Sequence, residues 1–128
     1  MIIKHLLDKR TSKILLLIVI VCVTILSLVP LQRLEIEVPS GTDKLVHIIM
    51  YFSVSTLALW SYSTGKTQTI QIVLMVITYS IFIEFLQEYM PLKRSGDFND
   101  VIANIIGVFL GIISQPILKK IKEFFLYN

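Results

Sequence analysis

Charged residues are scarce in this sequence. Of its 128 residues, 16% are Asp, Glu, Lys or Arg, and 55% are hydrophobic. Soluble domains contain on average about 25% charged residues. Small soluble domains also bury a low fraction of their surface and have no means to hide this much apolar area. The composition therefore excludes an ordinary soluble domain and favours a membrane protein, for which the bilayer is an apolar solvent.

Cysteine is nearly absent, and several catalytic signatures are missing. Cys22 is the only cysteine, which excludes an internal disulfide, and we expect it to be a small buried apolar residue. The sequence has neither a His-Glu-x-x-His metal motif nor a nucleophilic serine motif. No reaction class and no cofactor therefore follow from a motif.

Four apolar runs are long enough to cross a bilayer. They cover approximately residues 14–31, 45–62, 70–89 and 101–118, and a helix of about 20 residues spans the hydrocarbon core. Because lipid cannot satisfy backbone hydrogen bonds, these runs must be helical. The sequence predicts an all-α, polytopic bundle of four transmembrane helices that forms one domain over residues 1–128.

Lysine and arginine residues predict the orientation of this bundle. An N-terminus in the cytoplasm splits them eight to four: Lys4, Lys9, Arg10, Lys13, Lys66, Lys119, Lys120 and Lys122 lie inside, and Arg33, Lys44, Lys93 and Arg94 lie outside. Cytoplasmic loops carry the basic excess in membrane proteins, so both termini are expected inside a plasma membrane. The excess then faces anionic lipid, and nucleic acid is not an expected partner.

Polar residues gather at the outer ends of three predicted helices. The second helix opens with Asp43, Lys44 and His47, the third ends with Glu84 and Gln87, and the fourth follows Arg94 and carries Asp97, Asp100 and Asn104 at its start. Spacings of three and four place these groups on shared helical faces. At about 1.5 Å per residue, His47, Glu84 and Asn104 lie roughly 5–8 Å below the outer boundary. Ionisable groups at such depth are costly and therefore mark a candidate site.

Each group in this cluster has a chemical role to consider. His47 is a candidate general acid or base, oriented by Glu84 or Asp100, and these three are the candidate catalytic residues. The candidate ligand-binding residues are Asp43, Lys44, Gln87, Arg94, Asp97 and Asn104. Within that set, Lys44 and Arg94 are suited to a phosphate or carboxylate. A divalent metal ion among the carboxylates and the histidine is an alternative occupant.

Simpler structural roles remain open for several of the same residues. Asp43 can be a first-turn acid favoured by the helix dipole, and Asn104 can form an interhelical hydrogen bond. Gly107 and Gly111 continue the stripe of Asp100 and Asn104, and small residues at this spacing let helices approach closely. We expect intramolecular packing at these glycines, with a homodimer through the fourth helix as the alternative.

Two stretches resemble the VanZ-like family of small membrane proteins. The first is Asp43-Lys44-x-x-His47-x-x-x-Tyr51, and the second is Glu84-x-x-Gln87 followed by Arg94-x-x-Asp97-x-x-Asp100-x-x-x-Asn104-x-x-Gly107-x-x-x-Gly111. Together they cover roughly residues 42–112. Pro91-Leu92-Lys93-Arg94 departs from the Pro-Gly-Arg often found in the family. The resemblance implies a connection with the cell envelope and with resistance to the glycopeptide teicoplanin, but no reaction.

Three functions are consistent with these observations, and a fourth fits less well. The cluster can bind or process an envelope lipid headgroup or a lipid-linked cell-wall precursor at the outer face. It can shield or recognise such a partner without chemistry, or it can tie helix ends together as a scaffold. A small transporter needs an ionisable residue near the membrane midplane, where this sequence is apolar.

Overall fold

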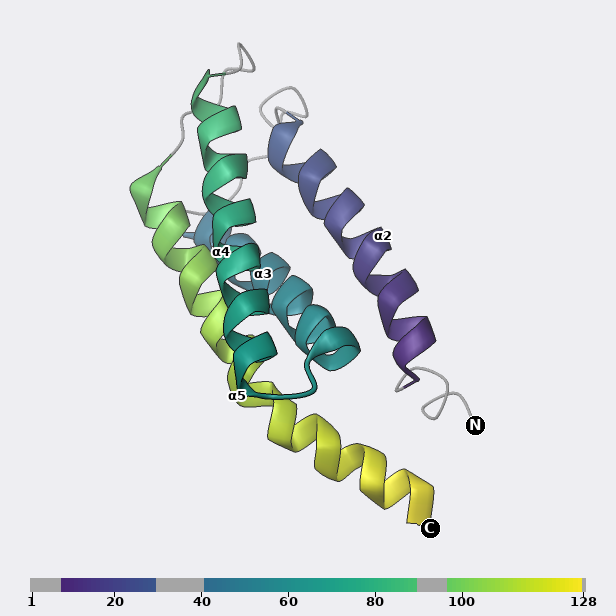
Figure 1. Ribbon diagram of the computed structural model, residues 1–128. Coiled ribbons are helices and arrows are strands. Elements are labelled where there is room, and N and C mark those ends of the chain that lie inside the picture. Colours follow the sequence, from purple (N-terminus) through teal and green to yellow (C-terminus); the bar gives the residue numbers. More distant parts are fainter. Residues whose placement is uncertain (1–7, 30–40, 90–96, 128) are drawn as a thin grey trace.

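The computed structural model describes residues 8–29, 41–89 and 97–127, and these residues contain four α-helices (Figure 1). The helices are α2 (Lys9–Leu28), α3 (Thr42–Tyr62), α4 (Lys66–Tyr89) and α5 (Phe98–Tyr127). Each is long and apolar enough to cross a membrane. The prediction of an all-α protein with four membrane-spanning helices is confirmed, whereas the N-in/C-in orientation stays a prediction.

Successive helices run in opposite directions (Figure 1). The beginning of α2 and the end of α5 therefore lie at one end of the bundle, which we call the terminal end. The ends of α2 and α4 and the beginnings of α3 and α5 lie at the opposite end, which we call the cluster end. The predicted polar residues of α3, α4 and α5 are consequently brought to the same end of the molecule.

The outer surface of the bundle is apolar and the interior is partly polar. Leu17, Met75 and Ile113 are more than half exposed, together with many other large apolar side chains. Ser55, Ser80 and other small polar residues are buried instead. A contiguous apolar surface of this kind suits a lipid environment rather than water. Cys22 is exposed on this surface, so the expectation that it is buried was wrong.

α3 and α4 end where predicted, at Tyr62 and Tyr89. The other helix ends differ from the predicted spans because hydropathy measures the apolar core and not the hydrogen-bonded helix. α2 begins at Lys9, after Asp8 accepts a hydrogen bond from the backbone N–H of Arg10, rather than at residue 14. It ends at Leu28 and not at residue 31. Val29 is extended, with ψ of 128°, as expected for a residue before proline. The other three helices begin at residues 42, 66 and 98, each three or four residues earlier than predicted.

α5 is the longest helix and continues well past its predicted end at residue 118. Its 30 residues span about 45 Å, whereas the hydrocarbon core is about 30 Å thick. Pro116 lies within it, and proline removes a backbone hydrogen bond and kinks a helix. Figure 1 shows the last part of α5, in yellow, turning away from the direction of its first part.

The closest helix packing joins α3 to α5 at two glycines. A Cβ atom at Gly107 would lie against the Ile48 carbonyl oxygen and 2.9 Å from the Phe52 backbone nitrogen. A Cβ atom at Gly111 would lie against the Ser55 hydroxyl and 3.0 Å from the backbone nitrogen of Thr56. Both glycines thus face α3 of the same chain, as the intramolecular reading predicted. A homodimer through the fourth helix, the alternative considered for these glycines, stays a prediction.

Candidate functional site

The first turns of α3 present three polar side chains at the cluster end. Gly41 precedes the helix with φ of 89°, a left-handed conformation that glycine adopts without strain. Asp43 lies in the first turn, where the helix dipole favours a negative charge. Lys44 and His47 follow at a spacing of three, on one face. Asp43 and Lys44 are partly exposed, whereas His47 is only 4% exposed.

Lys44 holds the beginning of α5 against the beginning of α3. Its Nζ atom lies 3.1 Å from Asp97 Oδ2 and 3.1 Å from Asp100 Oδ1. A third carboxylate, that of Asp43, lies 3.8 Å away. Asp100 is buried and Asp97 is partly exposed, so Lys44 links a carboxylate in the interior to one at the surface.

Asp97 also caps the start of α5. Its Oδ1 atom accepts hydrogen bonds of 2.9 Å from the backbone N–H and the side-chain amide of Asn99. The backbone N–H of Asn99, followed by the ammonium of Lys44, lowers the pKa of Asp97 below its usual value. The carboxylate is therefore stabilised in its charged form at neutral pH.

Beneath this ion-pair layer lies a buried network from three helices. His47 Nδ1 is 2.9 Å from Asn104 Oδ1, and Asn104 Nδ2 donates to Glu84 Oε1 at 3.2 Å. His47 Nδ1 also lies 3.5 Å from Glu84 Oε1. Because the Asn104 oxygen can only accept, this arrangement assigns the proton on Nδ1 of the imidazole. Asn104 is completely buried. Because it lies on α5 and contacts His47 of α3 and Glu84 of α4, it links these three helices.

The second nitrogen of His47 faces the ion-pair layer. His47 Nε2 lies 3.8 Å from Asp100 Oδ2. With the Nδ1 proton directed to Asn104, Nε2 is either protonated and attracted to Asp100 or able to donate its lone pair to a cation. The histidine is thus positioned between a buried amide and a carboxylate.

One group of side chains has the geometry to receive a divalent cation. Asp43, His47 and Asp100 each offer one ligand atom, and these atoms lie within 4.8 Å of one another. Oxygen and imidazole ligands suit several divalent ions. However, the ammonium of Lys44 already pairs with Asp100 and lies near Asp43, so a metal ion has to displace it.

The remaining predicted residues have different surroundings. Gln87 does not join the His47 network, because its Nε2 atom donates to the Ser27 carbonyl oxygen of α2 at 2.6 Å. Its position thus has a structural explanation that sequence reasoning missed, while ligand binding by Gln87 stays a prediction. Arg94 lies outside the described residues.

Two tyrosines near the network were not selected as site residues. Tyr51 is completely buried one turn after His47, and its hydroxyl has no hydrogen-bond partner within the described parts of the chain. Tyr79 lies beside it, with ring centroids 6.0 Å apart, and its hydroxyl is 2.8 Å from Thr24 Oγ1 in α2. The spacing of four between His47 and Tyr51 was the available signal for a shared helical face.

Comparison with known proteins agrees with this architecture. No curated protein and no solved structure matches the sequence. The model of the VanZ/LLP1 family, in contrast, matches residues 10–119. That region contains the whole cluster and most of all four helices. The chain therefore belongs to the VanZ/LLP1 family and is a multi-pass membrane protein of that family.

Proposed function

We propose that the cluster of α3, α4 and α5 binds the polar headgroup of an envelope lipid or of a lipid-linked cell-wall precursor at the outer face of the plasma membrane. The observation that carries this proposal is the layering of the cluster. A buried network of His47, Asn104 and Glu84 supports a partly exposed layer of Asp43, Lys44 and Asp97. Rigid buried groups beneath accessible charged groups are typical of a binding site.

The charge of the cluster indicates which part of a headgroup it recognises. Within the described residues, the cluster contains four carboxylates and a single lysine. Asp43, Asp97 and Asp100 lie within 4 Å of Lys44, and Glu84 lies in the buried network with His47. An anion at Lys44 has to displace Asp97 or Asp100, so a direct phosphate contact there gains no support. A primary amine fits better, because it donates three hydrogen bonds to carboxylates. We therefore expect an amine-bearing headgroup, and a divalent cation bound by Asp43, His47 and Asp100 is the alternative ligand.

Lipid retention by the purified protein tests this proposal. The protein is transferred from detergent into equal mixtures of phosphatidylethanolamine, phosphatidylcholine and phosphatidylglycerol, and the retained lipids are identified by native mass spectrometry. We expect enrichment of phosphatidylethanolamine, whose primary ammonium donates hydrogen bonds, over phosphatidylcholine, whose quaternary ammonium cannot. The same comparison with and without a chelator shows whether a divalent cation contributes.

An acidic variant in the cluster and one far from it provide the controls. Asp100→Asn removes a buried carboxylate that pairs with Lys44, whereas Glu123→Gln removes an exposed carboxylate near the terminal end. Loss of the lipid preference in Asp100→Asn, with retention in Glu123→Gln, supports the proposal. Equal lipid binding by both variants, or no preference in the wild type, contradicts it.

A scaffold role is the second candidate, favoured by the hydrogen bonds that His47 and Glu84 form with Asn104. A scaffold cluster predicts that variants of its buried residues lower thermal stability without changing lipid retention by the folded protein.

Two further roles extend the binding proposal. His47 would act as a general acid or base on the bound headgroup, and the protein would contribute to teicoplanin resistance. Teicoplanin susceptibility of cells carrying wild type or Asp100→Asn is the corresponding measurement in cells.

A further inference from the structure

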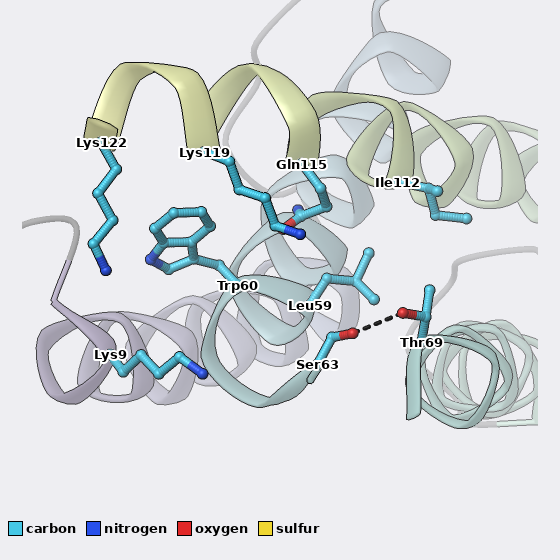
Figure 2. Close-up of a pocket in the computed structure, with 9 residues that line it drawn as sticks. All are labelled: Lys9, Leu59, Trp60, Ser63, Thr69, Ile112, Gln115, Lys119 and Lys122. Carbon is cyan, nitrogen blue, oxygen red and sulfur yellow. Dashed lines mark hydrogen bonds between the residues drawn. The ribbon is translucent and has the colours of Figure 1, made fainter. Parts of the chain in front are cut away.

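A polar pocket lies at the terminal end, away from the cluster. It has a volume of about 330 Å³ and is lined by residues of all four helices and of the turn after α3. The lining residues are Lys9, Leu59, Trp60, Ser63, Thr69, Ile112, Gln115, Lys119 and Lys122. Figure 2 shows Lys119 and Lys122 extending from α5 and Lys9 extending from α2, with Trp60 between them.

The pocket has a concentration of positive charge that its own side chains do not neutralise. None of the described residues lining it is acidic. Within the described part of the chain, its three lysines form no ion pair, and Lys122 instead lies 5.5 Å from the centre of the Trp60 ring. Asp8, next to Lys9 in sequence, caps α2. Convergent lysines around a hollow repel one another, and a bound anion removes that repulsion.

The remaining lining residues complete a site suited to a headgroup at a membrane boundary. Ser63 and Thr69 form a hydroxyl pair of 2.6 Å on the wall opposite α5 (Figure 2). Leu59 and Ile112 supply apolar surface, and tryptophan is a residue typical of the membrane interface. The lysines offer charge to a phosphate, while the apolar wall fits the adjoining glycerol and upper acyl chain.

The part of α5 beyond Pro116 places this pocket at a lipid surface. Lys119, Lys120 and Lys122 alternate there with the exposed apolar side chains Ile121 and Phe124. A helical segment with basic and apolar residues of this kind associates with the headgroup region of anionic membranes. These residues favour a lipid over a soluble metabolite as the ligand of the pocket.

We propose that this pocket binds the phosphate of an anionic membrane lipid, in the leaflet opposite to the one that supplies the ligand of the cluster. The proposal does not depend on the function of the cluster, since the two sites share no residue. It adds a basic lipid site to the carboxylate-rich site described above.

The single tryptophan of the chain makes the pocket directly observable. Trp60 is the only tryptophan, so its fluorescence reports on this site alone. The full-length protein is reconstituted in phosphatidylcholine vesicles that contain increasing amounts of brominated phosphatidylglycerol, and quenching of Trp60 is measured. We expect stronger quenching than with brominated phosphatidylcholine at the same mole fraction.

Two double variants with equal charge separate the pocket from general surface charge. Lys119→Gln with Lys122→Gln alters the pocket, while Lys66→Gln with Lys120→Gln alters lysines that do not line it. Loss of a direct hydrogen bond between a lysine and a phosphate weakens binding by about tenfold or more, so the pocket variant should lose roughly a hundredfold in lipid affinity. We expect the control variant to lose much less, and both variants to melt at the wild-type temperature.

Three results would overturn the proposal. The first is equal loss of quenching in the two double variants, which would mean that only general surface charge acts. The second is equal quenching by the brominated anionic and zwitterionic lipids in the wild type. The third is a change of Trp60 fluorescence with inorganic phosphate but no lipid preference, which would assign the pocket to a free anion.

Discussion

Gly107→Ala tests whether close packing of α3 on α5 holds the cluster together. The added methyl group would meet the Ile48 carbonyl oxygen and the Phe52 backbone nitrogen, at 2.9 Å from the latter. Backbone atoms cannot rotate away as a side chain can, so the two helices have to separate by several tenths of an ångström or more. Such overpacking costs about 1–3 kcal/mol.

The separation also acts on the buried network, because Ile48 follows His47 and Gly107 lies one turn after Asn104. The 2.9 Å contact between His47 Nδ1 and Asn104 Oδ1 then lengthens, and loss of such a hydrogen bond costs about 1 kcal/mol. Alanine offsets about 1 kcal/mol through its higher helix propensity than glycine. The net expectation is a decrease of roughly 1–3 kcal/mol in the free energy of unfolding.

Reversible unfolding in mixed micelles measures this difference, with Gly65→Ala as the matched control. A Cβ atom at Gly65 meets no other atom within 4 Å, and its φ is not in the left-handed range. Substitution there should therefore change stability by less than about 0.5 kcal/mol. If Gly107→Ala unfolds at the same denaturant concentration as Gly65→Ala, the close α3–α5 packing described here is wrong.

Three further predictions follow from the cluster and its surroundings. Asn104→Ala removes hydrogen bonds to an imidazole and a carboxylate, so we expect a loss of roughly 2–4 kcal/mol on unfolding; a loss below about 0.5 kcal/mol would contradict the network. The lowered pKa of Asp97 means that its stabilising contribution is present above the ordinary aspartate pKa and disappears as the pH falls through the lowered value. The stability difference between wild type and Asp97→Asn should therefore shrink on acidification, and a difference that grows would refute this assignment. In a background without the native cysteine, cysteines introduced at Ser40 and Ser95 should react with an impermeant thiol reagent in intact cells, and one at Thr67 should not. Labelling only at Thr67 would show that the orientation is the opposite of the one predicted.

The sequence was sufficient to predict the four helices and the meeting of polar residues at one end. Hydropathy locates each span, and helix alternation then fixes which residues share a depth in the membrane. The structure places His47 within 4 Å of both Glu84 and Asp100, as the common depth predicted. The glycine spacing likewise predicted the close contact of the fourth helix with a neighbour.

Other features depend on which helices are neighbours, and a single sequence does not specify this. Gln87 lies one turn after Glu84 on the same face of α4 but donates to the Ser27 carbonyl oxygen, because the end of α2 lies beside that turn. The basic pocket joins Lys9 to Lys119, which are far apart in the chain. The extension of α5 was missed because lysines lower hydropathy without interrupting backbone hydrogen bonds.

The most direct test of headgroup binding by the cluster uses Asp43→Asn, because Asp43 is about half exposed and pairs only at 3.8 Å with Lys44. A scaffold has little use for such a carboxylate, and its removal should change the melting temperature of the protein very little. A headgroup amine that it contacts should, however, lose a charged hydrogen bond, which corresponds to about tenfold weaker binding of phosphatidylethanolamine. We predict an unchanged melting temperature together with this loss of lipid binding. Unchanged lipid binding in the Asp43→Asn protein would contradict the assignment of the cluster as a headgroup site.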